Sequence, residues 1–280
     1  MVLLDSSSLP YTVAILLIEI SVGGVGVLSY FAWRGQITSG YVKAGSITIT
    51  PLACLAFLTF RTISEQGNVG DYLLDLNWIQ TTNFTFLAFF ICSLFYLLAA
   101  MLDKYRWVYY LGLLLTISGF FCLVSMAMLL APPVWSVFGA VASVIIGALV
   151  CGSSLMAMMW GHWYLTSGQL PKEPMIQMAI LVIGALLLQT VLVCCGALIT
   201  PRIEPINQSL IIVDLSQNPA FWLRITVGLF FPLILSVLAW RTAQIRGMMS
   251  STGLLYLVLG TVLVGEVLAR GLLFTTSRIV

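Results

Sequence analysis

The chain has 280 residues, of which 60% are hydrophobic and only 8% are charged, and it carries a net charge of +2 and a mean hydropathy of +1.07. So few charged side chains cannot cover the surface of a water-soluble domain. The small net charge also argues against a nucleic-acid-binding protein, because phosphate recognition needs a clustered basic face. The composition therefore predicts an integral membrane protein.

Apolar runs long enough to cross a bilayer follow one another along the chain. A membrane-spanning helix needs about 20 apolar residues. Runs of this size occupy residues 11–33, 42–60, 84–102, 107–131, 134–161, 175–199, 219–240 and 252–274. Residues 1–10 contain no Lys or Arg, so we expect the first helix to be retained rather than cleaved as a signal peptide. The sequence predicts an all-α bundle of about eight transmembrane helices that forms one domain over residues 1–280.

Basic residues are unevenly distributed over the connections between these runs. The connections after the first, third, fifth and seventh runs hold Arg34, Lys43, Lys104, Arg106, Lys172, Arg241 and Arg246. The opposite side has fewer basic residues and most of the acids, namely Asp5, Glu65, Asp71, Asp75, Glu204 and Asp214. Because Lys and Arg favour the cytoplasmic side, both termini are predicted to be non-cytoplasmic.

Two acids lie well inside predicted spans. Glu266 precedes Arg270 by four residues, one helical turn away on the same face. Such a pair either fixes the helix as an internal salt bridge or marks a ligand or proton path, and the sequence leaves both open. Glu19 has no such partner in its own helix, and it precedes Gly23 and Gly24, where another helix or a flat ligand could approach the backbone.

These residues are expected to lie in one half of the membrane. The predicted orientation places Glu19, Glu266 and Arg270 in the outer half, and Arg224 opens the seventh span at the same face. The sequence therefore indicates a polar cluster of these four residues.

The sole histidine and the six cysteines carry weaker indications. His162 follows Gly161 at the cytoplasmic end of the fifth run, where it is either a member of an interfacial aromatic belt or a point of proton entry. All six cysteines lie in apolar runs without a Cys-x-x-Cys spacing, so we expect buried small side chains rather than metal or haem ligands. With a single histidine, the chain cannot supply two axial imidazoles to a haem.

Several segments resemble the anchor subunit of dimethyl sulfoxide reductase and the membrane subunit of polysulfide reductase. Residues 253–256 (GLLY) and 265–274 (GEVLARGLLF) are similar to the last helix of this family, which ends on a Gly-Glu-x-x-x-Arg-Gly pattern. Residues 220–225 (AFWLRI) resemble the start of its seventh helix, and residues 19–24 (EISVGG) resemble its first helix.

This resemblance implies a quinone- or quinol-interacting anchor of a respiratory oxidoreductase complex in the inner (plasma) membrane of a prokaryote. The partners would be an iron–sulfur, ferredoxin-like subunit on the outer face and a large catalytic subunit, and the quinone would be menaquinone or ubiquinone. Glu19, Glu266 and Arg270 would serve proton chemistry, and His162 would be the proton entry. The implied quinone contacts are Glu19, Gly23, Gly24, Arg224 and Glu65. The family has a histidine and a glutamate near its second and third helices, whereas this chain has Arg61, Ile63, Glu65, Gln80 and Thr82 there.

Two other classes remain open at this point. A purely structural anchor of such a complex would need no quinone. A transporter of protons or small solutes would also use kinked helices and paired intramembrane charges.

Overall fold

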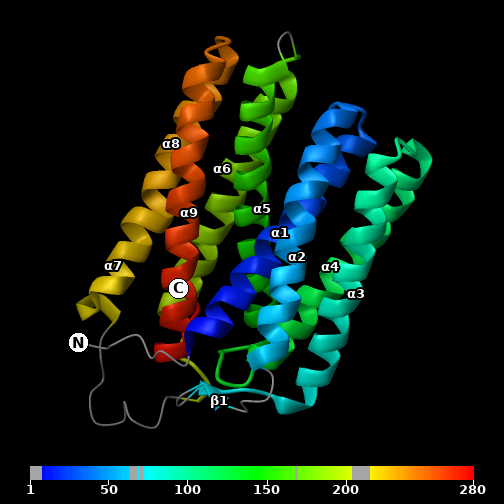
Figure 1. Ribbon diagram of the computed structural model, residues 1–280. Coiled ribbons are helices and arrows are strands. Elements are labelled where there is room, and N and C mark those ends of the chain that lie inside the picture. The colour runs from blue at the N-terminus through cyan, green and yellow to red at the C-terminus, as the bar shows by residue number, and fades with distance from the viewer. Residues whose placement is uncertain (1–7, 64–67, 70–71, 168–169, 204–214) are drawn as a thin grey trace.

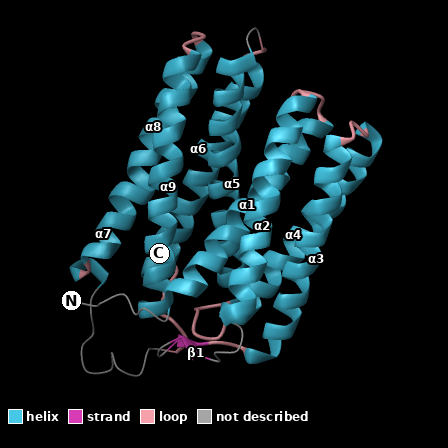
Figure 2. Cartoon of the chain, viewed as in Figure 1, coloured by secondary structure: helices cyan, strands magenta, loops and turns pink. Residues whose placement is uncertain are grey.

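The computed structural model describes residues 8–63, 68–69, 72–167, 170–203 and 215–280, and within these ranges eight helical spans are long and apolar enough to cross a membrane. Six of them are single helices: α1 (Leu9–Trp33), α2 (Ser39–Ile63), α3 (Ile79–Met101), α4 (Tyr105–Leu130), α5 (Val137–Ser167) and α6 (Glu173–Leu198). The seventh combines α7 (Pro219–Ile225), the π-helical turn η5 (Thr226–Phe230) and α8 (Phe231–Gln244), and the eighth is α9 (Met248–Thr276). Figures 1 and 2 show these helices as one bundle of roughly aligned rods. The predicted helical bundle is confirmed.

Short elements occupy one end of the bundle. Strands β1 (Asn68–Val69) and β2 (Tyr72–Leu73) pair antiparallel, and the single turns η2 (Leu76–Trp78) and η4 (Leu215–Gln217) precede α3 and α7. Tyr11 near the start of α1 lies 6.1 Å from Phe274 near the end of α9, measured between ring centroids. We call this the terminal end, and the end with the α1–α2, α3–α4, α5–α6 and α8–α9 connections the basic end.

The largest differences from the predicted boundaries are at α5, which ends at Ser167 instead of residue 161, and at α3, which begins at Ile79 instead of residue 84. The hydropathy of residues 80–83 is low, but a helix tolerates polar residues whose side chains bond within the helix. The Thr82 hydroxyl donates to the Trp78 carbonyl oxygen at 2.8 Å. The Asp75 carboxylate also accepts a bond from the backbone N–H of Asn77, which caps η2 where the chain enters α3.

Helices α1 and α5 form the centre of the bundle. Helix α1 packs against α2, α4, α5 and α9, and α5 packs against α1, α4, α6 and α9. Glycines permit the closest of these approaches, because a Cβ atom on Gly152 of α5 would lie 2.0 Å from the carbonyl carbon of Gly23 in α1. Close contact through glycine is the usual way in which helices associate inside a bilayer.

The terminal end is closed by side chains that bond across elements. The Tyr72 hydroxyl donates to the Leu130 carbonyl oxygen at 2.6 Å, and its ring packs edge-on against Phe274. Burial raises the pKa of the Tyr72 hydroxyl above its usual value, because the ionised form would lose its hydration. Beyond α9, Ile279 and Val280 are buried against the bundle.

The prediction that all six cysteines are buried was wrong for two of them. Cys122 and Cys151 are buried and Cys54 and Cys92 are half-buried, but Cys194 and Cys195 are exposed on α6. In a bilayer, an exposed position on an apolar span faces lipid rather than water, so hydropathy alone cannot distinguish the inside of a bundle from its lipid-facing surface.

Candidate functional site

The four charged residues expected to form a polar cluster lie together in the structure. They come from three separate spans: Glu19 from α1, Arg224 from α7, and Glu266 and Arg270 from α9. No more than 2% of the surface of any of these residues is exposed. We call these four residues the charged network.

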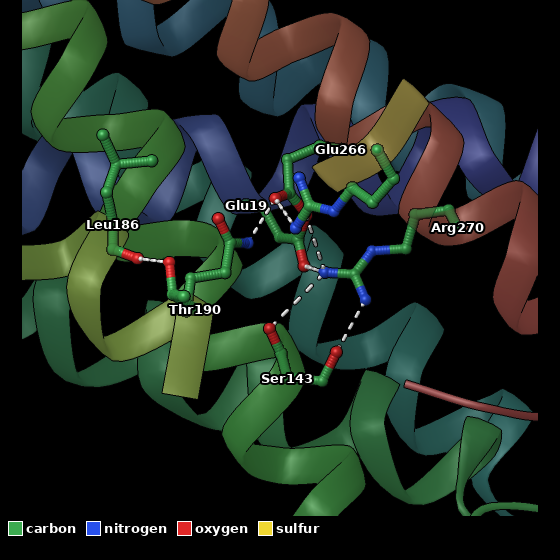
Figure 3. A network of polar contacts seen from close by, with 8 residues as sticks. Glu19, Ser143, Leu186, Thr190, Glu266 and Arg270 are labelled. Carbon is green, nitrogen blue, oxygen red and sulfur yellow. Dashed lines mark hydrogen bonds and ion pairs between the residues drawn. The ribbon is translucent and has the colours of Figure 1, made fainter. Parts of the chain in front are cut away.

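Arg270 connects the two carboxylates of the network. Its Nη2 atom donates to Glu19 Oε1 and lies 3.4 Å from Glu266 Oε2, and its Nη1 atom donates to Ser143 Oγ of α5 at 2.9 Å (Figure 3). The Nη2 atom of Arg224 donates to Glu266 Oε1 at 3.1 Å. Glu266 therefore contacts two guanidinium groups, whereas Glu19 contacts one.

The network is balanced in formal charge, with two carboxylates and two guanidinium groups. Placing an isolated charge in hydrocarbon costs several kcal/mol, so charged groups in a membrane need partners or a polar cavity. Mutual pairing explains how four ionisable side chains can be buried among apolar helices. It also means that removal of any one member leaves an uncompensated charge.

The network lies in the half of the bundle nearer the terminal end. Glu19 is ten residues beyond the start of α1 and Arg270 six residues before the end of α9. At a rise of 1.5 Å per residue, these separations correspond to about 15 Å and about 9 Å from the helix ends. The helices of the bundle, rather than bulk water, surround the network at this depth.

Two uncharged residues of the site were missed by sequence reasoning. Gln189 of α6 donates from Nε2 to Glu266 Oε1, and Ser143 accepts a bond from Arg270. Gln189 is an amide in the middle of a largely apolar run, which was a detectable signal. Ser143 had none, because serine is common in helices and often bonds to its own backbone, as Ser21 does to the Leu17 carbonyl.

Glycines leave space for the long side chains of the network. A Cβ atom on Gly147 of α5 would lie 2.7 Å from Arg270 Nη2 and 2.8 Å from Glu19 Oε1. Gly228, in the π-helical turn η5, and Gly265 of α9 bring their backbones together, and a Cβ atom on Gly228 would lie 2.6 Å from the Gly265 Cα atom. Any side chain at these positions would push the charged groups or the helices apart.

Several polar atoms of the network have no hydrogen-bond partner among the described residues. They are Glu19 Oε2, Arg224 Nε and Nη1, Arg270 Nε, and Gln189 Oε1. A cavity of about 10 Å³ beside Ser143 and Arg270 has room for about one water molecule. The site thus has polar atoms available for a water molecule or a substrate.

An apolar groove lies one helical turn from Glu19. It has a volume of about 320 Å³ and runs between α1, α4 and α5, where Val22, Gly23, Gly26 and Ala148 are among its lining residues. We call it the central groove. A Cβ atom on Gly23 would meet the backbone of α5, whereas a Cβ atom on Gly26 would meet nothing within 4 Å. Gly24 faces the side chains of Ile49 and Met156, which a Cβ atom would meet at the ordinary van der Waals distance of 3.5 Å.

The remaining predicted site residues are not part of the network. His162 is near the end of α5 at the basic end, with its Nδ1 atom 3.2 Å from the Tyr256 hydroxyl. It follows Ser143 by 19 residues on the same helix, or about 29 Å along the axis. Glu65 lies outside the described residues. Within the described ranges, no group of three His, Cys, Asp or Glu residues could hold a metal ion.

Comparison with known proteins does not identify the function of the site, so its function is inferred from its chemistry. No protein-family model matches this sequence, and no curated protein matches it significantly. The fold and the site define a multi-pass helical membrane protein with a buried, charge-balanced network of two acids and two arginines.

Proposed function

We propose that this chain is the membrane anchor and quinone-reactive subunit of a respiratory oxidoreductase complex. The observation that supports this proposal is the position of Glu19, a buried carboxylate one helical turn before Gly23, which lines an apolar groove that opens at the surface of the bundle. A quinone needs a flat apolar slot and a group that exchanges protons with its carbonyl oxygens. The central groove and Glu19 supply these two features.

Glu19 is better suited than Glu266 to exchange a proton. Glu266 contacts two arginines and Gln189, whereas Glu19 contacts Arg270 through one oxygen and has no partner for Oε2 among the described residues. When Glu19 takes up a proton, Arg270 keeps its contacts with Glu266 and Ser143. The network can therefore hold its geometry while one carboxylate changes its charge.

In the proposed reaction, quinol loses two electrons and two protons and becomes quinone, or the reverse. Glu19 takes or supplies the protons one at a time, and Arg224, Glu266 and Arg270 hold the carboxylate in place. Menaquinone and ubiquinone both fit this chemistry. The electrons pass to or from an iron–sulfur, ferredoxin-like subunit docked at the terminal end, which in turn serves a large catalytic subunit in the inner membrane of a prokaryote. His162, far from the network, would be an entry for protons from the basic end.

A purely structural anchor is the second candidate, and the charge balance of the network favours it. Four charges that neutralise one another can fix α1, α7 and α9 without any chemistry. The two functions differ in what they require of Glu19, because a structural role needs hydrogen bonds, whereas a redox role needs a group that gains and loses a proton.

The test combines purification with the Glu19→Gln substitution. Purification in a mild detergent should yield a complex that contains iron and quinone, whereas the chain alone should be colourless. Gln keeps a hydrogen-bonding amide, so the Glu19→Gln complex should assemble, while quinone-linked turnover falls by about 10²-fold or more. Activity with a soluble dye that bypasses quinone should stay near normal.

The matched control is Ser21→Ala, two residues away on α1 and equally buried, which should leave both activities near normal. Unchanged quinone turnover in Glu19→Gln would remove Glu19 from the mechanism, whereas an iron-containing complex without quinone-linked turnover would favour the structural anchor. Equal losses in the quinone and dye assays would indicate damaged assembly and remove the support for a proton role. A chain that purifies alone, without iron or quinone, would contradict both anchor functions and favour a transporter.

A further inference from the structure

A second apolar groove runs along α1 and α4 toward the basic end. It has a volume of about 460 Å³, and its lining includes Gly26, Ser29, Tyr30 and Leu113. This volume is in the range of sites that hold small ligands. We call it the lateral groove. It shares Gly26, Tyr30 and Thr116 with the central groove but continues from there toward the basic end.

Two hydroxyl groups in the lining of the lateral groove are already bonded to the protein. The hydroxyls of Ser29 and Thr116 both donate to the Gly112 carbonyl oxygen, at 3.4 and 2.8 Å. A ligand in the middle of this groove would therefore find mainly carbon atoms. Such a surface suits a hydrocarbon chain rather than a polar ring.

A smaller and more polar pocket adjoins the lateral groove at the basic end. Its volume is about 140 Å³, and it lies between the α1–α2 and α3–α4 connections, where Gly35, Ser39 and Asp103 are among its lining residues. The pocket shares Ala32, Val108 and Tyr109 with the lateral groove. An apolar channel thus leads directly to a polar mouth.

The two connections that flank this mouth carry an excess of cations. Residues 34–43 and 103–106 contain four basic residues, Arg34, Lys43, Lys104 and Arg106, and one acid, Asp103. Four positive charges and one negative charge give these two segments a net charge of +3. Lys43 is paired with Asp103 at 2.8 Å, whereas Lys104 and Arg106 are exposed. Trp33, Tyr109 and Tyr110 are close to these cations in the sequence and have exposed rings, which is common at the interface between membrane and water.

We infer that an anionic phospholipid binds here, with an acyl chain in the lateral groove and its phosphate headgroup at the cationic mouth. The depth of the groove suits hydrocarbon, the mouth lies where a headgroup would, and the net charge complements a phosphate. The mouth lies at the basic end, away from Glu19, and the inference does not depend on the proposed redox function, although the lateral groove shares Gly26, Tyr30 and Thr116 with the central groove.

Gly26 offers a way to fill the lateral groove without disturbing the bundle. Nothing lies within 4 Å of a Cβ atom on Gly26, so Gly26→Phe would place its ring in open space along the groove. Gly184 of α6 is the matched control, because a Cβ there also meets nothing within 4 Å and the position lies outside the groove. Both substitutions add the same side chain to an open glycine on a membrane helix.

The assay is native mass spectrometry of the delipidated protein titrated with phosphatidylglycerol or with phosphatidylcholine. Wild-type protein and Gly184→Phe should bind phosphatidylglycerol preferentially, and Gly26→Phe should lose this binding. The Lys104→Gln/Arg106→Gln pair should weaken it by roughly fivefold for each charge removed. The Lys172→Gln/Arg246→Gln pair, at other connections of the same end, should not.

Three results would overturn the inference. The first is equal phosphatidylglycerol binding in Gly26→Phe and the wild type, and the second is no preference for the anionic lipid. The third is recovery of quinone, or of a partner helix, from the lateral groove of the purified protein. Because Lys104 and Arg106 are exposed, their substitution tests the headgroup site even if Gly26→Phe does not fold.

Discussion

Removal of Arg270 should be the most damaging single change in the charged network. The Arg270→Met substitution keeps an unbranched side chain but leaves two carboxylates with one guanidinium group. Glu19 then has no cation within hydrogen-bond distance among the described residues, and Ser143 loses its donor.

The magnitude follows from the contacts that are lost. At 3.4 Å and an effective dielectric constant near 20, the attraction between Arg270 and Glu266 is about 5 kcal/mol. Part of it is offset because the guanidinium no longer has to be desolvated. Breaking a buried pair by removing one partner typically lowers the free energy of unfolding by about 3–5 kcal/mol, and we expect this range for Arg270→Met.

A double-mutant cycle isolates the pairing. Glu19→Gln alone leaves an excess positive charge and Arg270→Met alone an excess negative charge, whereas the double variant restores balance with Arg224 and Glu266. The double variant should therefore lose less stability than the sum of the single variants, with a coupling of about 1–3 kcal/mol. The free energy of unfolding would be measured by denaturation in detergent micelles.

The exposed pair at the basic end is the matched control. Lys43 and Asp103 are 2.8 Å apart, but their side chains are 31% and 51% exposed. The corresponding cycle with Lys43→Gln and Asp103→Asn should give about 1 kcal/mol or less. If the Arg270 cycle gives no larger coupling than this control, the charged network is not a buried ionic structure and the reasoning fails.

Three further predictions concern other parts of the molecule. Reporter fusions at Lys172 and after Val280 should lie on opposite sides of the membrane, with the C-terminus outside, and a cytoplasmic C-terminus would refute the predicted orientation. Gly152→Leu should strongly reduce the yield of folded protein, because its Cβ would lie 2.0 Å from the Gly23 backbone. Gly253→Leu should not reduce the yield, because its Cβ would meet nothing within 4 Å. Equal yields of the two variants would contradict the close approach of α1 and α5. The pKa of Tyr72 is raised in the folded state, so its contribution to stability is complete below the usual tyrosine pKa of about 10 and is lost as pH rises further. The Tyr72→Phe variant should therefore lose less stability at alkaline pH, as measured by denaturation. An unchanged pH profile would exclude this role.

Much of the fold could be predicted because bilayer physics leaves few alternatives. Every backbone polar group within hydrocarbon must bond inside the span, so a run of about 20 apolar residues has to be helical. The predicted run at 107–131 agrees closely with α4, which the structure places at Tyr105–Leu130. The predicted boundaries are wrong where polar side chains continue a helix, as at Gln80–Asn83. Hydropathy does not detect polar side chains whose hydrogen bonds are made within the helix.

The break in the seventh span is a feature that hydropathy could not predict. A run of apolar residues predicts one continuous helix, whereas in the structure the turn η5 lies between α7 and α8. Pro232 follows at the start of α8, and it has no backbone N–H to donate to the preceding turn. Such π-helical turns are frequent at functional sites, and this one places Gly228 against Gly265, beside Arg224.

The charged members of the site were predictable for the same energetic reason as the spans. An ionisable residue inside a membrane is costly, so Glu19, Glu266 and Arg270 stand out from the apolar runs. Their positions along the helices also indicated a common depth. The uncharged partners could not be found in this way, because the role of Ser143 depends on how α5 packs against α9, and the sequence alone does not specify this.

The network also joins the two ends of the sequence. Glu19 and Arg270 are separated by 251 residues, and they meet because α1, α5 and α9 pack against one another in the bundle. During synthesis Glu19 therefore enters the membrane long before Arg270 is available. The network can form only after the last span has packed, so it stabilises the completed bundle rather than any earlier stage of it. A carboxylate that must enter the bilayer without its partner must also be able to exist there uncharged, and this property is what the proposed proton exchange requires of Glu19.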